Sequence, residues 1–175
     1  MLTFKELEEL DLKANPGAFS TYDMEVLVPE IEKLQPGQIY LEIGVDRGKS
    51  LSIANMVARE GVEIHGVDLR EDPGVLGTYF HRGNSIEVGQ NWKGPKIAVL
   101  FIDGDHSMWG CHMDIQSWYP HMEEHGVILF HDCDESSPGV LQAVSEFVDT
   151  HRGLVQDFQL FKRTDKNTSM ARVQL

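Results

Sequence analysis

Two short segments rich in aspartate and histidine each follow a run of apolar residues. Asp103-Gly104-Asp105-His106 comes directly after the apolar run 97–102. His131-Asp132-Cys133-Asp134 comes directly after the apolar run 127–130. Because burying an isolated charge costs free energy, carboxylates and imidazoles gathered in this way usually bind a cation, bind substrate or transfer protons. Helix capping and solvent-exposed loops are the alternative explanation.

A third segment, Leu41–Ser50, combines glycines with acidic residues. Gly44 and Gly48 allow the backbone to turn tightly and to approach a ligand closely. Glu42 and Asp46 would repel a pyrophosphate, and the middle glycine of the dinucleotide-binding fingerprint is missing. This chemistry suits a ligand that carries an ammonium or sulfonium group, although a generic strand–helix turn has the same composition.

Two polar positions between these segments are candidates for contacts with a nucleoside. Asp68 ends the short apolar run 64–67 and lies about 20 residues beyond Gly48, where an acidic residue commonly binds ribose hydroxyls. A helix N-cap or loop aspartate is the alternative. The small polar turn Gly83-Asn84-Ser85 could hold the edge of an adenine, and a plain turn explains it nearly as well.

The pattern between these segments predicts elements that would bring them together. Apolar runs predict strands at 39–43, 64–68, 79–81, 97–102 and 127–130, and helical spacing predicts helices at 50–59, 108–121 and 140–150. This alternation predicts right-handed βαβ crossovers and a doubly wound, mostly parallel sheet. Segments 158–161 and 170–173 predict a hairpin around 165–167, and hence an antiparallel edge. The predicted fold is a three-layer α/β sandwich, with its ligand at the carboxyl ends of the strands.

The first 38 residues are predicted to form a helical cap on this core. Phe4–Lys13 has the pattern of a short acidic helix, which Asn15-Pro16-Gly17 ends. The Ser20-x-x-Asp23 step predicts the N-terminal cap of a second helix that runs through Leu34. Residues 1–175 are therefore expected to form one domain, with the cap at 1–38 and the core at 39–175.

Composition restricts the partners and the compartment. The formal net charge of −13 argues against nucleic acid or an anionic lipid surface as the main partner, and favours a neutral or cationic small molecule. No apolar run approaches the ~20 residues that span a membrane. The two cysteines stand outside any C-x-x-C motif, and no signal peptide precedes them, so we expect a cytoplasmic protein with reduced thiols.

Four motifs resemble those of class I S-adenosylmethionine-dependent methyltransferases: Leu41–Ser50, His65–Asp68, Phe101–Ser107 and Gly126–Asp132. The sequence is most similar to the small branch near the macrocin-type sugar O-methyltransferases, and more distantly to the catechol-type enzymes. The resemblance covers residues 38–175. It implies a Rossmann-like, seven-stranded sheet with an antiparallel C-terminal strand, S-adenosylmethionine as cofactor, and O-methyl transfer to a hydroxylated small molecule such as a sugar or natural product.

The resemblance also implies roles for individual residues. Glu42 and Gly44 would flank the methionine part of the cofactor, Asp68 would hold the ribose, and Ser85 would lie near the adenine. The full set of predicted cofactor-binding residues is Glu42, Gly44, Asp46, Gly48, Ser50, Asp68, Ser85 and Asp103.

Asp103 and Asp132 match the metal-binding aspartates of the metal-dependent members. In those enzymes Mg²⁺ is the Lewis acid and the template for the acceptor hydroxyl. Where the catechol type has an asparagine, this chain has Cys133, and a thiol is a poor Mg²⁺ ligand. Either Asp134 completes the metal set, or the site is metal-free. The predicted catalytic residues are Asp103 and the two candidate proton acceptors, His106 and His131.

Two departures from the family pattern leave further alternatives open. Met108-Trp109 replaces the usual Tyr-Glu, which changes a wall near the cofactor or the acceptor. The short N-terminal segment implies a small lid, or one borrowed from another subunit of a homo-oligomer. A nicotinamide-dependent oxidoreductase is allowed by the βαβ pattern but disfavoured by Asp46 and the missing glycine. A cofactor-binding protein without catalysis is a third hypothesis.

Overall fold

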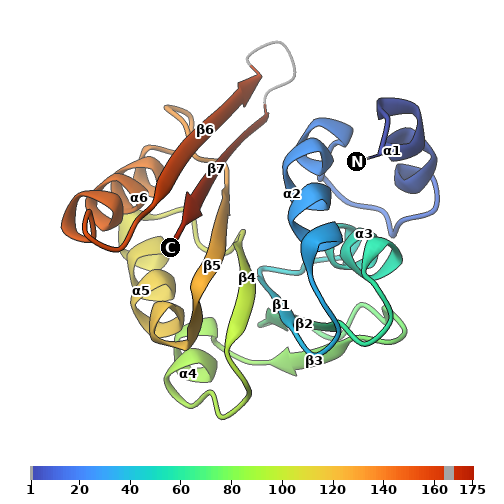
Figure 1. The fold of residues 1–175 in the computed structure, drawn as a ribbon, viewed down its shortest axis with the longest axis horizontal. Helices are drawn as coiled ribbons and strands as arrows, with labels where there is room; N and C mark the ends of the chain where they lie inside the picture. Colours follow the sequence, from blue (N-terminus) through green and yellow to red (C-terminus); the bar gives the residue numbers. More distant parts are fainter. Residues whose placement is uncertain (1, 164–167) are drawn as a thin grey trace.

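The strands of the protein coincide with the apolar runs of its sequence (Figure 1). The computed structural model describes residues 2–163 and 168–175, and these form a seven-stranded sheet in the order β3-β2-β1-β4-β5-β7-β6. Its strands are β1 (Ile39–Ile43), β2 (Glu63–Asp68), β3 (Tyr79–Arg82), β4 (Ile97–Ile102), β5 (Met122–His131), β6 (Asp157–Arg163) and β7 (Thr168–Gln174). Its helices are α1 (Phe4–Asp11), α2 (Thr21–Lys33), α3 (Lys49–Val57), α4 (Ser85–Gln90), α5 (Met108–Trp118) and α6 (Pro138–Thr150), with a 3₁₀ turn, η1 (Tyr119–His121).

The direction of the strands confirms the predicted doubly wound sheet. Strands β1 to β5 pair in parallel, and β7 pairs antiparallel with both β5 and β6. From β1 the chain adds β2 and β3 on one side and β4 and β5 on the other, so strand order reverses between β1 and β4. Ligands of such sheets bind outside the carboxyl ends of the strands at this point. The predicted turn at 165–167 lies outside the described residues.

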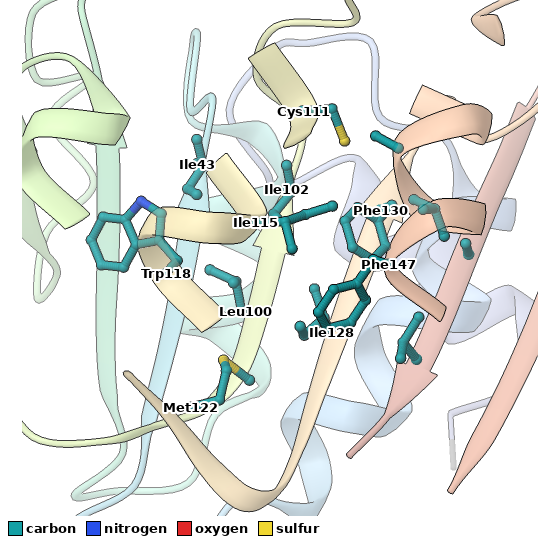
Figure 2. Packing of buried hydrophobic residues seen from close by; sticks show 14 of the residues in the cluster. Ile43, Leu100, Ile102, Cys111, Ile115, Trp118, Met122, Ile128, Phe130 and Phe147 are labelled. Atoms are coloured by element: carbon teal, nitrogen blue, oxygen red, sulfur yellow. The ribbon is translucent and has the colours of Figure 1, made fainter. Parts of the chain in front are cut away.

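Helices cover both faces of the sheet, so the fold has the three layers expected (Figure 1). Helices α4, α5 and α6 lie on one face, and α1, α2 and α3 lie on the other. Figure 2 shows the core between the sheet and α5 and α6, where Ile102, Phe130 and Trp118 are among the buried side chains. All six residues of β4 are buried, which explains why the strand is continuously apolar.

The helical cap forms as the capping motifs predict. The hydroxyl of Ser20 accepts a hydrogen bond from the backbone N–H of Asp23, whose carboxylate accepts in turn from the backbone N–H of Ser20. This capping box starts α2, which packs against α3 and β7. None of the helices in residues 2–163 and 168–175 is long and apolar enough to cross a membrane.

One helix and several boundaries differ from the sequence prediction, and three of these differences have a clear cause. Helix α4 was not predicted, because its segment is rich in Gly and Asn; the side chain of Asn84 starts it by accepting from the backbone of Ile86 and Glu87. Strand β5 begins at Met122 rather than 127, because Met122 pairs with Ile97 across an irregularity in the register. Helix α5 gives way to the 3₁₀ turn before residue 121.

Candidate active site

A cleft of about 730 Å³ opens at the carboxyl ends of β1, β2, β4 and β5. Its position is the reversal of strand order, and its volume is typical of small-molecule sites. The predicted site residues that line it are Gly44, Asp46, Ser50, Asp68, Ser85, Asp103, His106, His131 and Asp132. The other three predicted residues, Glu42, Gly48 and Asp134, lie outside its lining.

The turn after β1 forms one wall of the cleft. Gly44 has φ +84°, and a Cβ at this position would collide with the backbone carbonyl of Asp103. Only glycine therefore lets the ends of β1 and β4 approach this closely. Asp46 also has a positive φ, +47°, which is unfavourable for a residue with a side chain. The side chain of Asp46 forms an ion pair with Arg70, and its backbone N–H donates a hydrogen bond to Asp68.

Asp68 joins this turn to the end of β2. Its Oδ2 accepts from the backbone N–H of Asp46 at 2.8 Å, and its Oδ1 accepts from the backbone N–H of Arg70 at 2.8 Å. A carboxylate has about four acceptor positions, so both oxygens keep acceptor capacity toward the cleft. Asp68 therefore shapes the loop while still facing the ligand space.

Glu42 lies beneath the cleft rather than in its wall. Its side chain is fully buried and accepts hydrogen bonds from the Tyr40 hydroxyl at 2.8 Å and the Ser50 hydroxyl at 2.6 Å. Burial raises the pKa of Glu42 to about 8, against the opposing effect of these two hydrogen bonds. Glu42 reaches the cleft through Ser50, which does line it.

Ser85 has a comparable partner at the far end of the cleft. Its hydroxyl lies 2.5 Å from Oδ1 of Asp114, a residue of α5 that is 2% exposed. Burial raises the pKa of Asp114 to about 6. The indole N–H of Trp118 donates to the carbonyl of Ser85 at 3.0 Å, which fixes the backbone at the same point.

The end of β5 brings an imidazole between three carboxylates. His131 Nδ1 lies 3.2 Å from an Asp132 oxygen and 3.4 Å from an Asp103 oxygen. Its Nε2 lies 3.5 Å from Asp23 at the start of α2. Burial alone would lower the pKa of His131, but the carboxylates of Asp103, Asp132 and Asp23 raise it to about 12. Despite burial, the histidines His106 and His131 hold the pKa of Asp103 below its ordinary value.

His106 approaches the same carboxylates from the cleft. Its Nε2 lies 3.6 Å from Asp103 and 3.4 Å from Asp132, and its side chain is 47% exposed. The nearby carboxylates of Asp103 and Asp132 raise the pKa of His106. His106 is thus more accessible to a bound molecule than His131, whose side chain is 12% exposed.

Comparison with known families decides the class of this site. The family model of a methyltransferase domain matches residues 41–133, which is more than half of the chain and spans the turn after β1 through the end of β5. The chain is a class I S-adenosylmethionine-dependent methyltransferase. It is therefore an enzyme that binds S-adenosylmethionine and transfers its methyl group, which replaces the oxidoreductase and non-catalytic alternatives.

Solved structures share the fold of the methyltransferase at low sequence identity. The O-methyltransferase from Bacillus cereus in complex with SAH has a TM-score of 0.72 at 14% identity, over 98% of this chain and 90% of that one. Cofactor-bound Rv0187 from MTB has a TM-score of 0.74 at 14% identity, over 97% and 88% of the two chains. The MycE methyltransferase of the mycinamycin pathway, in complex with Mg and SAH, has 0.67 at 16%, over 97% of this chain and 53% of that one. A search of curated proteins gave no match.

The methyltransferase cleft fits its cofactor in charge. Asp46, Asp68 and Asp103 place three carboxylates in its wall. Such a wall attracts a ligand that carries sulfonium and ammonium groups.

One group of side chains in the methyltransferase fits a metal ion. Among the described residues, Asp103, His131 and Asp132 each offer a donor atom, and these atoms lie within 4.8 Å of one another. Both ring nitrogens of His131 are buried, and neither has a hydrogen-bond partner of good geometry among residues 2–163 and 168–175. Two carboxylates and an imidazole that face a cleft fit a divalent cation, which would displace the proton that the carboxylates otherwise hold on His131.

The structure does not bring the predicted ligand Asp134 into this group. Its Oδ1 accepts from the backbone and the hydroxyl of Ser136, so it closes the turn after β5 instead. Cys133 between them is 3% exposed and points into the core, as a small apolar residue would. Asp132 adopts a positive φ of +52°, and the chain direction therefore changes sharply between Asp132 and Asp134.

Sequence reasoning missed Asp114 and gave Asp23 only a capping role. Both sit inside helices, whereas the predicted site residues follow the carboxyl ends of strands. Asp114 follows Gly110 by one helical turn, and both line the cleft. This i, i+4 spacing puts the two residues on one face of α5 but does not fix the direction in which that face points.

The segment between α1 and α2 supplies the remaining wall of the cleft. Gly17, Ala18 and Phe19 line it. Asn15 ties this segment to the core, because its side chain donates to the carbonyl of Arg47 at 3.0 Å and its backbone donates to the Ser52 hydroxyl at 3.1 Å. We call residues 15–19 the lid segment, because Gly17, Ala18 and Phe19 form this wall.

Proposed function

We propose that this methyltransferase transfers the methyl group of S-adenosylmethionine to a hydroxyl group of a small acceptor, such as a sugar or natural product. The observation that supports this most is the group of Asp103, His131 and Asp132, which adjoins His106 in the cleft. Hydroxyl acceptors must lose a proton during methyl transfer, and this group combines a cation site with an accessible imidazole. The likeness to an O-methyltransferase fold agrees with the proposal.

In this proposal, each residue has a definite task. Asp103 and Asp132 would hold Mg²⁺ with the help of His131, and the ion would supply Lewis-acid chemistry to the acceptor hydroxyl. His106, half exposed, accepts the proton of that hydroxyl, and Asp103 keeps its imidazole oriented. Asp23 orients His131 from the opposite side. The lid residue Phe19 and the buried strand ends exclude water from the reacting groups.

The cofactor contacts follow from the lining of the cleft. Gly44 and Ser50 lie where the methionine part would bind, Asp68 would bind the ribose, and Ser85 would contact the adenine. Glu42 and Gly48 support this surface from behind, since Glu42 accepts from Ser50 and Gly48 adopts the positive φ that starts α3. The direct role first predicted for Glu42 thus becomes an indirect one.

The decisive test is a turnover assay with S-adenosylmethionine and a panel of sugars, phenols and amines, read by mass spectrometry. We expect methylation of a hydroxylated acceptor, loss of turnover with EDTA, and recovery with Mg²⁺. Methylation confined to amines would contradict O-methyl transfer. Turnover indifferent to EDTA would contradict the metal and favour a mechanism that uses the histidines alone.

A further inference from the structure

The buried carboxyl of Asp114 controls the direction of a hydroxyl in the cleft. Asp114 itself is 2% exposed, and its Oδ1 accepts from the Ser85 hydroxyl at 2.5 Å. Its other oxygen lies against Gly104, where an added Cβ would be 3.0 Å away. The indole of Trp118 holds the carbonyl of Ser85 at 3.0 Å. Ser85 is therefore fixed from two sides while it faces the cleft.

This arrangement sets the hydrogen-bonding character of Ser85. A serine hydroxyl has one proton and two lone pairs. Because the ionised carboxylate of Asp114 is only an acceptor, the proton of Ser85 is directed away from the ligand. Burial raises the pKa of Asp114 to about 6, so above that pH the carboxylate is ionised. Ser85 then presents lone pairs to the cleft, which attract an N–H group and repel a carbonyl oxygen.

We propose that Asp114 is a positioning residue that makes Ser85 an acceptor for the exocyclic amino group of the cofactor's purine, and so selects 6-aminopurine over 6-oxopurine nucleosides. The inference rests on the proposed contact between Ser85 and the adenine. It extends that contact, because it assigns the selectivity to the nearly buried residue that holds the Ser85 hydroxyl. A 6-oxopurine would place its oxygen against the lone pairs of Ser85 and lose the hydrogen bond.

The experiment compares two ligands that differ at one position of the purine. S-adenosylhomocysteine and S-inosylhomocysteine are titrated calorimetrically at pH 8 into the wild-type protein, Ser85→Ala and Asp114→Asn. We expect the wild type to bind the adenosyl ligand at least about tenfold more tightly. In Ser85→Ala the acceptor is gone, and in Asp114→Asn the amide can donate to Ser85 and release its proton toward the cleft. Both variants should bring the two affinities to within about threefold.

Asp105→Asn is the matched control. Asp105 also lines the cleft, but its carboxylate accepts from the backbone N–H of Ser107 rather than from Ser85. The substitution removes the same charge and should keep the wild-type ratio of affinities. A purely structural role for Asp114 would lower both affinities without changing their ratio.

Three results would overturn the proposal. They are equal binding of both ligands by the wild type, an unchanged ratio in Asp114→Asn, and an equal loss of selectivity in Asp105→Asn. If Asp114→Asn does not fold, the ratio in Ser85→Ala decides, because an unchanged ratio there also contradicts the proposal. Binding of neither ligand would instead contradict the cofactor site on which the inference rests.

Discussion

At the scale of single residues, the chemistry depends on which side chains share the ends of β4 and β5. Asp132 contacts both His106 and His131 and belongs to the candidate metal group. We expect Asp132→Asn to lower kcat roughly 10- to 100-fold, because the variant keeps the shape but loses the charge that holds the cation. The affinity for S-adenosylhomocysteine should change much less. Steady-state kinetics and calorimetry provide the two measurements.

The same substitution at Asp134 tests whether this residue is a metal ligand, as the sequence predicts, or only closes its own turn. Asp134 caps its own turn through Ser136 and lies outside the metal group. Asp134→Asn should therefore retain most of the wild-type kcat. A loss as large as that of Asp132→Asn would restore Asp134 as a ligand and contradict the group described by the structure.

Glu42 gives a second prediction at this scale, concerning pH and stability. The pKa of this buried carboxyl is raised from 4.5 to about 8, so the folded state retains a proton that the unfolded chain releases. The free energy of unfolding should therefore fall as the pH rises from 4.5 to about 8. Glu42→Gln carries no titrating proton, so it should lose less stability over this window. The difference should be on the order of a few kcal/mol.

Urea unfolding at pH 5 and pH 8 measures this effect. Glu124→Gln is the control, because Glu124 is exposed and makes the same change of charge on the surface. Its stability should follow the wild type at both pH values. Parallel pH profiles for Glu42→Gln and the wild type would show that Glu42 does not retain its proton on folding.

At the scale of elements, the sequence predicts strand ends better than helix faces. The runs at 97–102 and 127–130 are apolar throughout because both faces of their strands are covered, and the polar residues after them stand out. The carboxyl ends of parallel strands meet at one edge, so Asp103 and Asp132 could be placed together from the sequence. This reasoning has no equivalent for side chains on helices.

Asp114 and Asp23 show why the rest of the site was not predictable. Asp114 lines the cleft and Asp23 contacts His131 only because each helix packs at one particular rotation against the sheet, and that rotation depends on the whole core. The turn after β5 is similar. Asp132 at φ +52° separates its side chain from that of Asp134, and no local pattern distinguishes the two aspartates.

The lid segment gives the prediction that belongs to this scale. The side chain of Asn15 makes one hydrogen bond to the turn after β1, through the carbonyl of Arg47 at 3.0 Å. Asn15→Ala removes it, which should weaken S-adenosylhomocysteine binding roughly fivefold and speed proteolysis of the segment. Lys13→Ala, at an exposed position nearby, should change neither quantity. Equal effects in both variants would mean that the segment does not depend on Asn15.

At the scale of the whole molecule, the cleft collects residues from both sides of the point where strand order reverses. Strands β2 and β3 lie on one side of β1, and β4 and β5 lie on the other, and residues from both sides line the cleft. A ligand that contacts Asp68 and Asp103 together therefore binds groups from both sides of this point. The net charge of −13 adds a long-range attraction for the cationic cofactor.

Thermal unfolding measures how strongly such a ligand stabilises the folded protein. A ligand that binds only the folded state at 100 times its Kd stabilises it by about 2.7 kcal/mol. For a chain of this size, S-adenosylhomocysteine at that concentration should raise the Tm by roughly 5 to 10 °C. NADH should not raise the Tm, because Asp46 repels a pyrophosphate. The turn that begins at Gly44 also lacks the middle glycine of the dinucleotide-binding fingerprint, which would accommodate a pyrophosphate. A rise with NADH as large as that with S-adenosylhomocysteine would mean that the cleft does not discriminate by charge.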